Sequence, residues 1–380
     1  MAGTSCRTVP LHKRSQLNRV LAVQSLHVCA ANTERLLELA RDYMPRCGSK
    51  VKTLLLTWWT DADLWELPRE RDKFEVQQAL AAAGRFTGLE SASPPTLPEI
   101  CVLQDALIAT ILPACSNLLD LTVLQHTNTE LSFVNPKGDE VEFDAWRTQV
   151  ALQGIGGRIT AAGLSLGGSN SNFFLAVGRP LNLLPNIKHL SIRVTDESFD
   201  RIMQDLFLRI SELQKLVSFE LDTASLSAWM ELQINPPRSM TQLILSGVRD
   251  LQLMQLADVL TSAPIVSLCL RHFSVAHFQL PSRRPDNLRV ENLSIAGCTA
   301  QTLLDFFDLA PLKSVEFCAN RRGRSNRIST RRLQAFILKH RTTLLSFKIH
   351  WNLLDPLASV SWINHSLAWE GISVRVETFG

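Results

Sequence analysis

The sequence predicts an α/β solenoid in which parallel strands line a concave face and helices cover a convex face, as in a horseshoe. A short apolar phrase with the spacing L-x-x-L-x-L recurs about ten times along the chain. Segments with helical periodicity separate the later phrases. The phrases also recur at a nearly constant interval, which is typical of stacked repeats. Their central residues in the last part of the chain are Phe219, Leu243, Leu268, Leu293, Val315 and Phe347.

Each phrase combines a turn with a strand. Its last two apolar residues are two positions apart, as in a strand that turns alternate side chains into a core. The first apolar residue lies three positions earlier, where the chain enters the strand. Apolar stripes with helical spacing follow the phrases in 199–213, 253–260, 303–309 and 333–340, and Ser329 is a candidate N-cap for the last of them.

The first half of the chain is less regular, so we divide the sequence into a lead or cap (1–20), irregular repeats with long inserts (21–186), and regular repeats with a C-terminal cap (187–380). We expect a first strand at 23–28, a degenerate phrase at 161–166 and a last strand through 372–376. The inserts predict an apolar helix from Glu99 to Leu112. They also predict a hairpin over 131–143 that turns at Pro136–Gly138.

The phrases resemble those of leucine-rich repeat proteins, most clearly from residue 187 onward. That family places an Asn or Cys three residues after the phrase, where its side chain bonds the turn backbone. Cys298, Asn320 and Asn352 match this position, whereas Val248 and Phe273 depart from it, so the turns must differ. The loose repeats and long inserts are similar to the divergent arrays of fungal F-box-like proteins.

Composition indicates a folded chain with no obvious affinity for nucleic acid or membrane. The chain has 380 residues, of which 46% are hydrophobic, and a formal net charge of +3. Its eight cysteines form no C-x-x-C pair, and the amino terminus lacks the apolar run of a secretory signal. We therefore expect a cytoplasmic or nuclear protein, not a secreted one, with no cofactor and no metal.

The strand alternation predicts a binding surface. Residues between and just after the inward-pointing apolar positions should face the concave groove, where small polar side chains dominate and charges of both signs occur. Such a strip suits a protein or peptide partner better than a nucleic acid; the alternative is a solvated face without a partner. The charged candidates on this face are Glu220, Asp222, Arg271, Glu316, Lys348 and His350.

A basic loop is the second candidate for binding. Six arginines fall within 321–332, in the loop after the strand that ends at Phe317, and Arg321, Arg322, Arg324 and Arg327 carry most of this charge. The run suits an acidic peptide or a phosphate. The alternative, which we favour, is a solvated loop whose arginines lie against the helix, and no aromatic residue interleaves the run for base stacking.

One motif predicts catalysis instead. Gly163-Leu-Ser165-Leu-Gly167 fits the G-x-S-x-G nucleophile elbow of serine esterases. Ser-Asn-Ser-Asn follows closely and is a poor helix opening, and no His-Gly-Gly stretch lies upstream as an oxyanion donor. The alternative is a strand end followed by a glycine loop. Gly154-Ile-Gly156-Gly157 likewise fits a flexible turn better than a phosphate site, and His272 and His277 lack a repeated metal-ligand spacing.

We therefore predict a non-catalytic protein–protein interaction scaffold, with an esterase using Ser165 as the alternative. The F-box resemblance implies substrate recognition for a Skp–cullin–F-box ubiquitin ligase, and hence a Skp-type adaptor as a partner. Residues 1–20 are too few to hold an F-box. Leu97-Pro98-Glu99-Ile100 resembles the opening of that module but sits inside the array.

Overall fold

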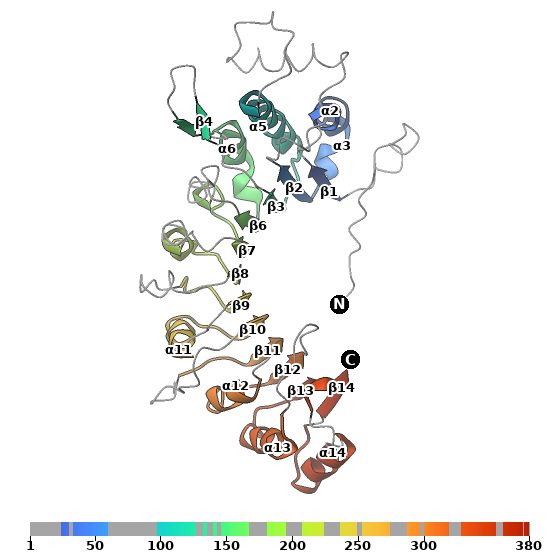
Figure 1. Cartoon of the computed structure of the whole chain (residues 1–380), viewed down its shortest axis with the longest axis vertical. Helices are drawn as coiled ribbons and strands as arrows, with labels where there is room; N and C mark the ends of the chain where they lie inside the picture. The colour runs from blue at the N-terminus through green and yellow to red at the C-terminus, as the bar shows by residue number, and fades with distance from the viewer. Residues whose placement is uncertain are drawn as a thin grey trace, which may run out of the picture. The chain divides into compact units, whose positions relative to one another are not determined.

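Figure 1 shows the structure, a computed structural model, as a ribbon. The chain divides into two compact units, Met1–Ser198 and Phe199–Gly380. The residues that it describes are 24–29, 33–59, 97–126, 132–134, 140–142, 146–166, 181–194, 207–223, 236–248, 253–273, 287–296, 300–318, 328–354, 360–374 and 376–379. Among them, twelve strands run parallel, five in the first unit and seven in the second, and two more form an antiparallel hairpin.

In the first unit the parallel strands follow one another in chain order, β1-β2-β3-β6-β7. Helices stand beside them on one face (Figure 1). The strands are β1 (Ser25–Cys29), β2 (Thr53–Trp59), β3 (Asp120–His126), β6 (Ala161–Leu166) and β7 (His189–Val194). The helices are α2 (Thr33–Glu38), α3 (Met44–Cys47), α5 (Leu97–Ala114) and α6 (Trp146–Ile155), with a π-helical turn at Leu39–Tyr43 and 3-10 turns at Gly48–Lys50 and Gly156–Arg158.

The second unit repeats the same plan in the order β8-β9-β10-β11-β12-β13-β14. Its strands are β8 (Ser218–Asp222), β9 (Gln242–Ser246), β10 (Ser267–Arg271), β11 (Asn292–Ala296), β12 (Ser314–Cys318), β13 (Ser346–His350) and β14 (Val376–Phe379). Its helices are α11 (Leu253–Ser262), α12 (Ala300–Phe306), α13 (Thr330–Lys339) and α14 (Val360–Trp369), with a 3-10 turn at Trp351–Leu353.

The L-x-x-L-x-L phrases form the core, as the sequence predicts. In the phrase that contains β8, the three apolar residues Leu216, Phe219 and Leu221 are completely buried. The strands pair in register, so the last apolar residue of each phrase stacks on its equivalent in the next repeat and buries apolar surface continuously. This row comprises Leu221, Leu245, Leu270, Ile295, Phe317 and Ile349.

A forked backbone hydrogen bond joins successive repeats at the entrance of each strand. The carbonyl oxygen of Val217, the second residue of its phrase, accepts hydrogen bonds from the N–H groups of both Thr241 and Gln242 in the next repeat, each 3.0 Å long. This satisfies two donors that would otherwise lie unpaired at the entrance of the strand. The same fork recurs at the carbonyls of Thr241, Val266, Glu291 and Lys313, and in the first unit at Gln24, Lys52, Leu119 and Thr160.

Side chains in the first unit add a second link beside this fork. The residue just before the phrase donates to a backbone carbonyl of the preceding repeat: Asn117 Nδ2 to Ser49 at 2.6 Å and Asn186 Nδ2 to Gly157 at 2.6 Å. Arg158 makes the equivalent bond to the carbonyl of Ser116 at 2.7 Å. The turns must approach closely for this. A Cβ atom on Gly156 would lie 1.9 Å from the carbonyl oxygen of Leu183, so the glycine opens a tight inter-repeat turn.

The predicted inserts and caps can now be compared with the structure. The helix expected over 99–112 is α5, and the hairpin expected over 131–143 is the pair β4 (Ser132–Val134) and β5 (Glu140–Glu142). The degenerate phrase at 161–166 is β6. Ser329 caps α13, because its hydroxyl oxygen accepts a hydrogen bond from the Arg332 N–H. The hairpin turn and residues 199–206 of the expected stripe lie outside the described residues.

One local expectation is wrong. The last strand begins only at Val376: Ile372 and Val374 are buried but precede it, and the Ile372 N–H still donates to the Leu367 carbonyl at the end of α14. Asn352 is exposed, and its backbone N–H donates to His350 Nδ1; residues 355–359 are not described, so the expected side-chain bond to the turn stays a prediction. Where the family has a polar residue, Val248 and Phe273 are buried, each directly after a left-handed residue.

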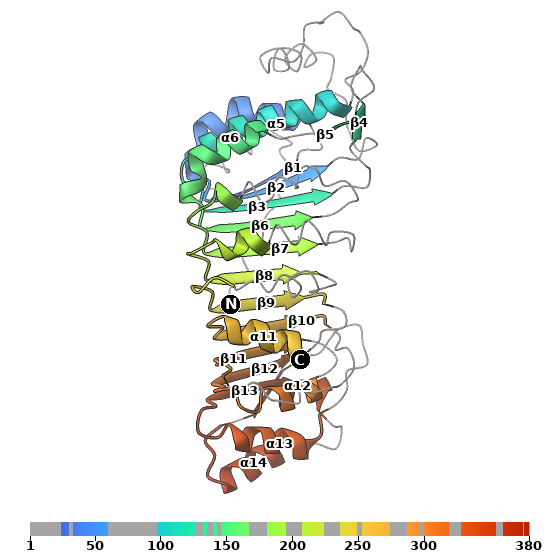
Figure 2. The same ribbon diagram turned by 90° about the vertical axis from the view of Figure 1, so that its left-hand side faces the viewer.

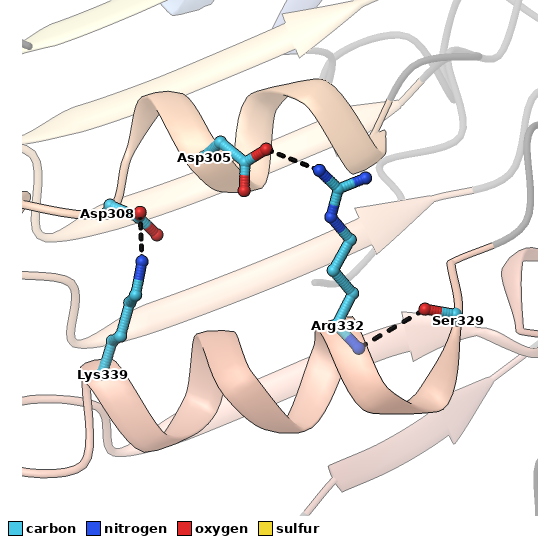
Figure 3. Close-up of polar contacts among 5 residues, drawn as sticks. All are labelled: Asp305, Asp308, Ser329, Arg332 and Lys339. Atoms are coloured by element: carbon cyan, nitrogen blue, oxygen red, sulfur yellow. Dashed lines mark hydrogen bonds and ion pairs between the residues drawn. The ribbon is translucent and has the colours of Figure 1, made fainter.

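Polar contacts also join α12, and the turn that follows it at Asp308, to α13 on the helical face (Figure 3). Arg332 donates to Asp305 at 2.7 Å, and Lys339 forms an ion pair with Asp308. The Asp308 side chain is only 5% exposed, so Lys339 neutralises a nearly buried carboxylate, whereas the Asp305 pair lies near the surface. A pair of the second kind contributes at most about 1 kcal/mol.

The phrase register predicts the effect of charge on each face of a strand. Leu268 in β10 is 1% exposed, and its neighbour Ser267 is half-buried on the opposite face. Leu268→Asp should lower the free energy of unfolding by several kcal/mol, because it buries an unpaired carboxylate. Ser267→Asp is the matched control and should change stability little. Thermal melts check this; equal melting temperatures for both variants would contradict the register.

A buried histidine predicts a pH dependence of stability. His340 follows α13, is 3% exposed, and its ring lies 4.5 Å from that of Phe336. Its Nε2 atom has no hydrogen-bond partner among the described residues. Burial lowers its pKa and nearby Lys339 lowers it further, while Asp308 and the Ala310 backbone act in the opposite direction.

Because the pKa of His340 is lowered in the folded chain, the unfolded chain takes up the proton first as the pH falls. Stability should therefore be highest above about pH 6.5 and decline below it toward the folded pKa, by up to about 1.4 kcal/mol per pH unit. His340→Phe keeps an aromatic ring and removes the titration. Urea unfolding of both proteins through this window should show a shallower decline for the variant; parallel curves would contradict the assignment.

Candidate binding surface

The second unit leaves one face of its sheet open. Along β8, β10, β11, β12 and β13, the second and fourth residues are buried and the first, third and fifth are half-buried or exposed. Helices α11, α12 and α13 stand on the buried side of these strands (Figure 1). We call the opposite side, formed by the first, third and fifth residues of β8–β13 with their neighbours in β14, the open face.

In-register pairing arranges the open face in rows that cross the strands, which Figure 2 shows side by side and pointing in one direction. The first row consists of small hydroxyl and amide side chains: Ser218, Gln242, Ser267, Asn292, Ser314 and Ser346. The second row contains Glu220, Ile244, Cys269, Ser294, Glu316, Lys348 and Glu377. The third contains Asp222, Ser246, Arg271, Ala296 and Cys318, with His350 and Phe379 paired beyond them.

All six charged candidates from the sequence lie on this open face. Arg271 reaches across β9 to Glu220, with 3.5 Å between Nη1 and Oε1, and Lys348 lies 3.7 Å from Glu377. These side chains are between 35% and 61% exposed. Exposed ion pairs at such distances are weak and screened by salt. A partner can therefore replace them with ion pairs of its own at little cost in free energy. Glu377 was missed because the expected last strand ended at Val376, one residue before it.

Cys318 sits beside Glu316 on the same face. Burial, the Glu316 carboxylate and nearby Cys269 together raise the pKa of its thiol to about 11, and the thiol hydrogen-bonds to Glu316. It is therefore protonated at neutral pH and a poor nucleophile. Cys269 and Cys318 are both free, and two strand spacings, about 9–10 Å, separate β10 from β12, which is too far for a disulfide.

The first unit has an open face of its own with a half-buried acid. Asp120, Ala161 and His189 share one row across β3, β6 and β7, and the small alanine separates the two ionisable residues. Burial raises the pKa of Asp120, and His189 partly offsets this. In the next row, Gly163 leaves room for Thr122, whose side chain a Cβ atom would meet at 2.9 Å. Asp120 is not among the residues predicted from the sequence, although it occupies the third position of a phrase.

The structure describes only some of the residues in the basic loop and in the candidate nucleophile elbow. Arg321, Arg322, Arg324 and Arg327 lie outside the described residues, whereas Arg332 pairs with Asp305 on the helical face. Ser165 lies within β6, paired in register with Leu124 on one side and Arg193 on the other. The segment after Leu166, where the elbow would turn, is not described, so the esterase alternative stays a prediction.

His272 is described, and its backbone is unusual. It has a φ of 49°, a left-handed conformation that Gly247, with φ of 76°, adopts one repeat earlier. Both residues donate their N–H to the next strand, so the conformation serves the turn. His277 and Cys298 lie outside the described residues. Within the described ranges, no three His, Cys, Asp or Glu side chains cluster as a metal site would require.

Comparisons with known proteins add little to this picture. No protein-family model and no curated protein matches the sequence. Among solved structures, the chain is similar to an internalin (inlF) from Listeria monocytogenes, with 10% identity, a TM-score of 0.28, and coverage of 80% of this chain and 90% of that one. None of the described helices has the length and hydropathy of a membrane span. In-register parallel strands, each built on one L-x-x-L-x-L phrase, give the chain the α/β fold of a leucine-rich repeat solenoid.

Proposed function

We propose that the chain is a non-catalytic protein–protein interaction scaffold that binds its partner on the open face of β8–β13. The observation that carries this proposal is the accessible charged surface: the six candidates from the sequence come from four strands, β8, β10, β12 and β13, which are far apart in sequence but belong to one sheet. The sheet backbone already holds these groups in place before a partner binds. Less conformational entropy is therefore lost on binding.

The charge of the open face favours a protein or peptide over a nucleic acid. Four carboxylates (Glu220, Asp222, Glu316 and Glu377) and two cations (Arg271 and Lys348) give it a net charge of −2 with histidine neutral. Nucleic-acid binding depends on cationic side chains that contact phosphates. A surface with a net negative charge would repel those phosphates. Mixed charges between small polar side chains instead set the orientation and the rate of association of a protein partner.

Charge reversal tests this surface. Glu220→Lys with Asp222→Lys should weaken partner capture about tenfold, because two favourable contacts become repulsive. Glu212→Lys is the control: Glu212 follows the helical turn 207–211 and pairs with an arginine, Arg209, at 3.7 Å, but it does not belong to the open face. Quantitative pull-downs should recover a set of proteins with parent and control that the double variant loses, at equal melting temperatures.

Equal recovery by the double variant and the control would reject the open face. The arginine run at 321–332 would then be the next candidate. A finer form of the proposal makes the bound partner a substrate of a Skp–cullin–F-box ligase in the cytoplasm or nucleus. It is supported only by the sequence resemblance, and co-purification of a Skp-type adaptor with the full chain tests it.

The non-catalytic part of the proposal has its own test at Ser165. We expect a fluorophosphonate probe to leave the purified protein unlabelled and short-chain p-nitrophenyl esters to remain intact, because we assign Ser165 to a strand and not to a nucleophile elbow. Labelling that disappears in Ser165→Ala would overturn this part and favour the esterase alternative. A variant at neighbouring Ser191, which pairs with Gly163 in β7, is the control for nonspecific labelling.

A further inference from the structure

The sheet of the second unit ends at β14. One edge of this strand pairs with β13, and no strand follows it in the sheet order of the described residues. An unprotected edge presents backbone N–H and C=O groups that readily pair with another chain. Whether these backbone groups of β14 already have hydrogen-bond partners therefore decides whether another strand can add to the sheet.

The side chain of Asn364 takes the place of the missing strand at Val376. Its Oδ1 accepts a hydrogen bond from the Val376 N–H at 2.7 Å, and its Nδ2 donates to the Val376 carbonyl at 3.1 Å. A carboxamide carries one acceptor and a donor in one plane, as a peptide group does. Asn364 thus satisfies both backbone groups that an added strand would use at this residue.

The position of Asn364 explains how it reaches the edge. It lies on α14, one residue after Ile363, which is completely buried in the core, while Asn364 itself is only partly buried. Figure 1 shows α14 next to β14 at the C-terminal end of the unit. An open groove lies between them, lined by Ser361, His365 and Glu377 among others.

The protection does not extend along the whole strand. Successive residues of a strand direct their backbone groups to opposite edges, so Thr378 turns the same way as Val376. Thr378 is exposed, and no described side chain caps it as Asn364 caps Val376. The edge is closed at one residue and open two residues later.

We infer that Asn364 is an edge cap, which prevents β14 from pairing with β14 of a second copy of this chain. A second copy is the relevant competitor because identical edges always match: two β14 strands related by a two-fold axis would pair antiparallel. An exposed pair of edges needs at least two outward residues to form a ladder. Within the described strand Val376–Phe379, occupying Val376 leaves only Thr378 available on each copy.

Removing the amide tests the cap. Asn364→Ala should raise the self-association constant about tenfold or more, measured by light scattering after size exclusion over a range of concentrations. Adding Thr378→Pro should restore the monomer, because proline has no N–H to donate. Ser361→Ala changes the same groove without touching Val376 and should behave as the parent.

Two results with Asn364→Ala would overturn the cap: a folded protein as monomeric as the parent, or association that survives Thr378→Pro. If Asn364→Ala does not fold, the cap can still be tested in the parent chain, by measuring the hydrogen-exchange rates of individual backbone amides. The Val376 amide should exchange about tenfold more slowly than the Thr378 amide. Equal exchange rates would show that Asn364 does not protect the edge.

Discussion

The fold depends on the in-register parallel pairing of one repeat with the next. The forked hydrogen bonds at the strand entrances fix this register, since a single carbonyl such as that of Val217 holds two N–H groups of the following repeat. A shift by one residue would break each fork and also turn the buried row onto the open face. Backbone pairing and burial therefore select the same arrangement, and each repeat builds on its neighbour.

The same constraint creates the candidate binding surface. In the second unit, helices α11, α12 and α13 lie on the same side of the strands, which leaves the other side open. Charged side chains on the other side, such as Glu316 and Lys348, come into register because their phrases do. Stability and recognition thus use alternate residues of the same strands, so open-face charges can vary with little effect on the core.

The sequence predicted the features that repeat and missed those that occur once. The phrase period and the strand alternation located the strands and placed residues such as Glu220 and Arg271 on one face, because both follow from local spacing. Asn364 could not be found this way: an Asn on a helix becomes a cap only through its contact with Val376, which the sequence does not reveal. The turns at Val248 and Phe273 also departed from the family pattern, because a left-handed backbone there replaces the polar side chain.

Cysteine accessibility along a single strand tests the central claim most directly. In a variant without the eight native cysteines, single cysteines would be placed at each position of β11, Asn292–Ala296, and labelled with a maleimide under native conditions. The structure predicts labelling at 292, 294 and 296 that is about tenfold or more faster than at Leu293 and Ile295, where labelling requires local opening. Uniform rates, or the opposite alternation, would contradict a sheet with one buried and one open face.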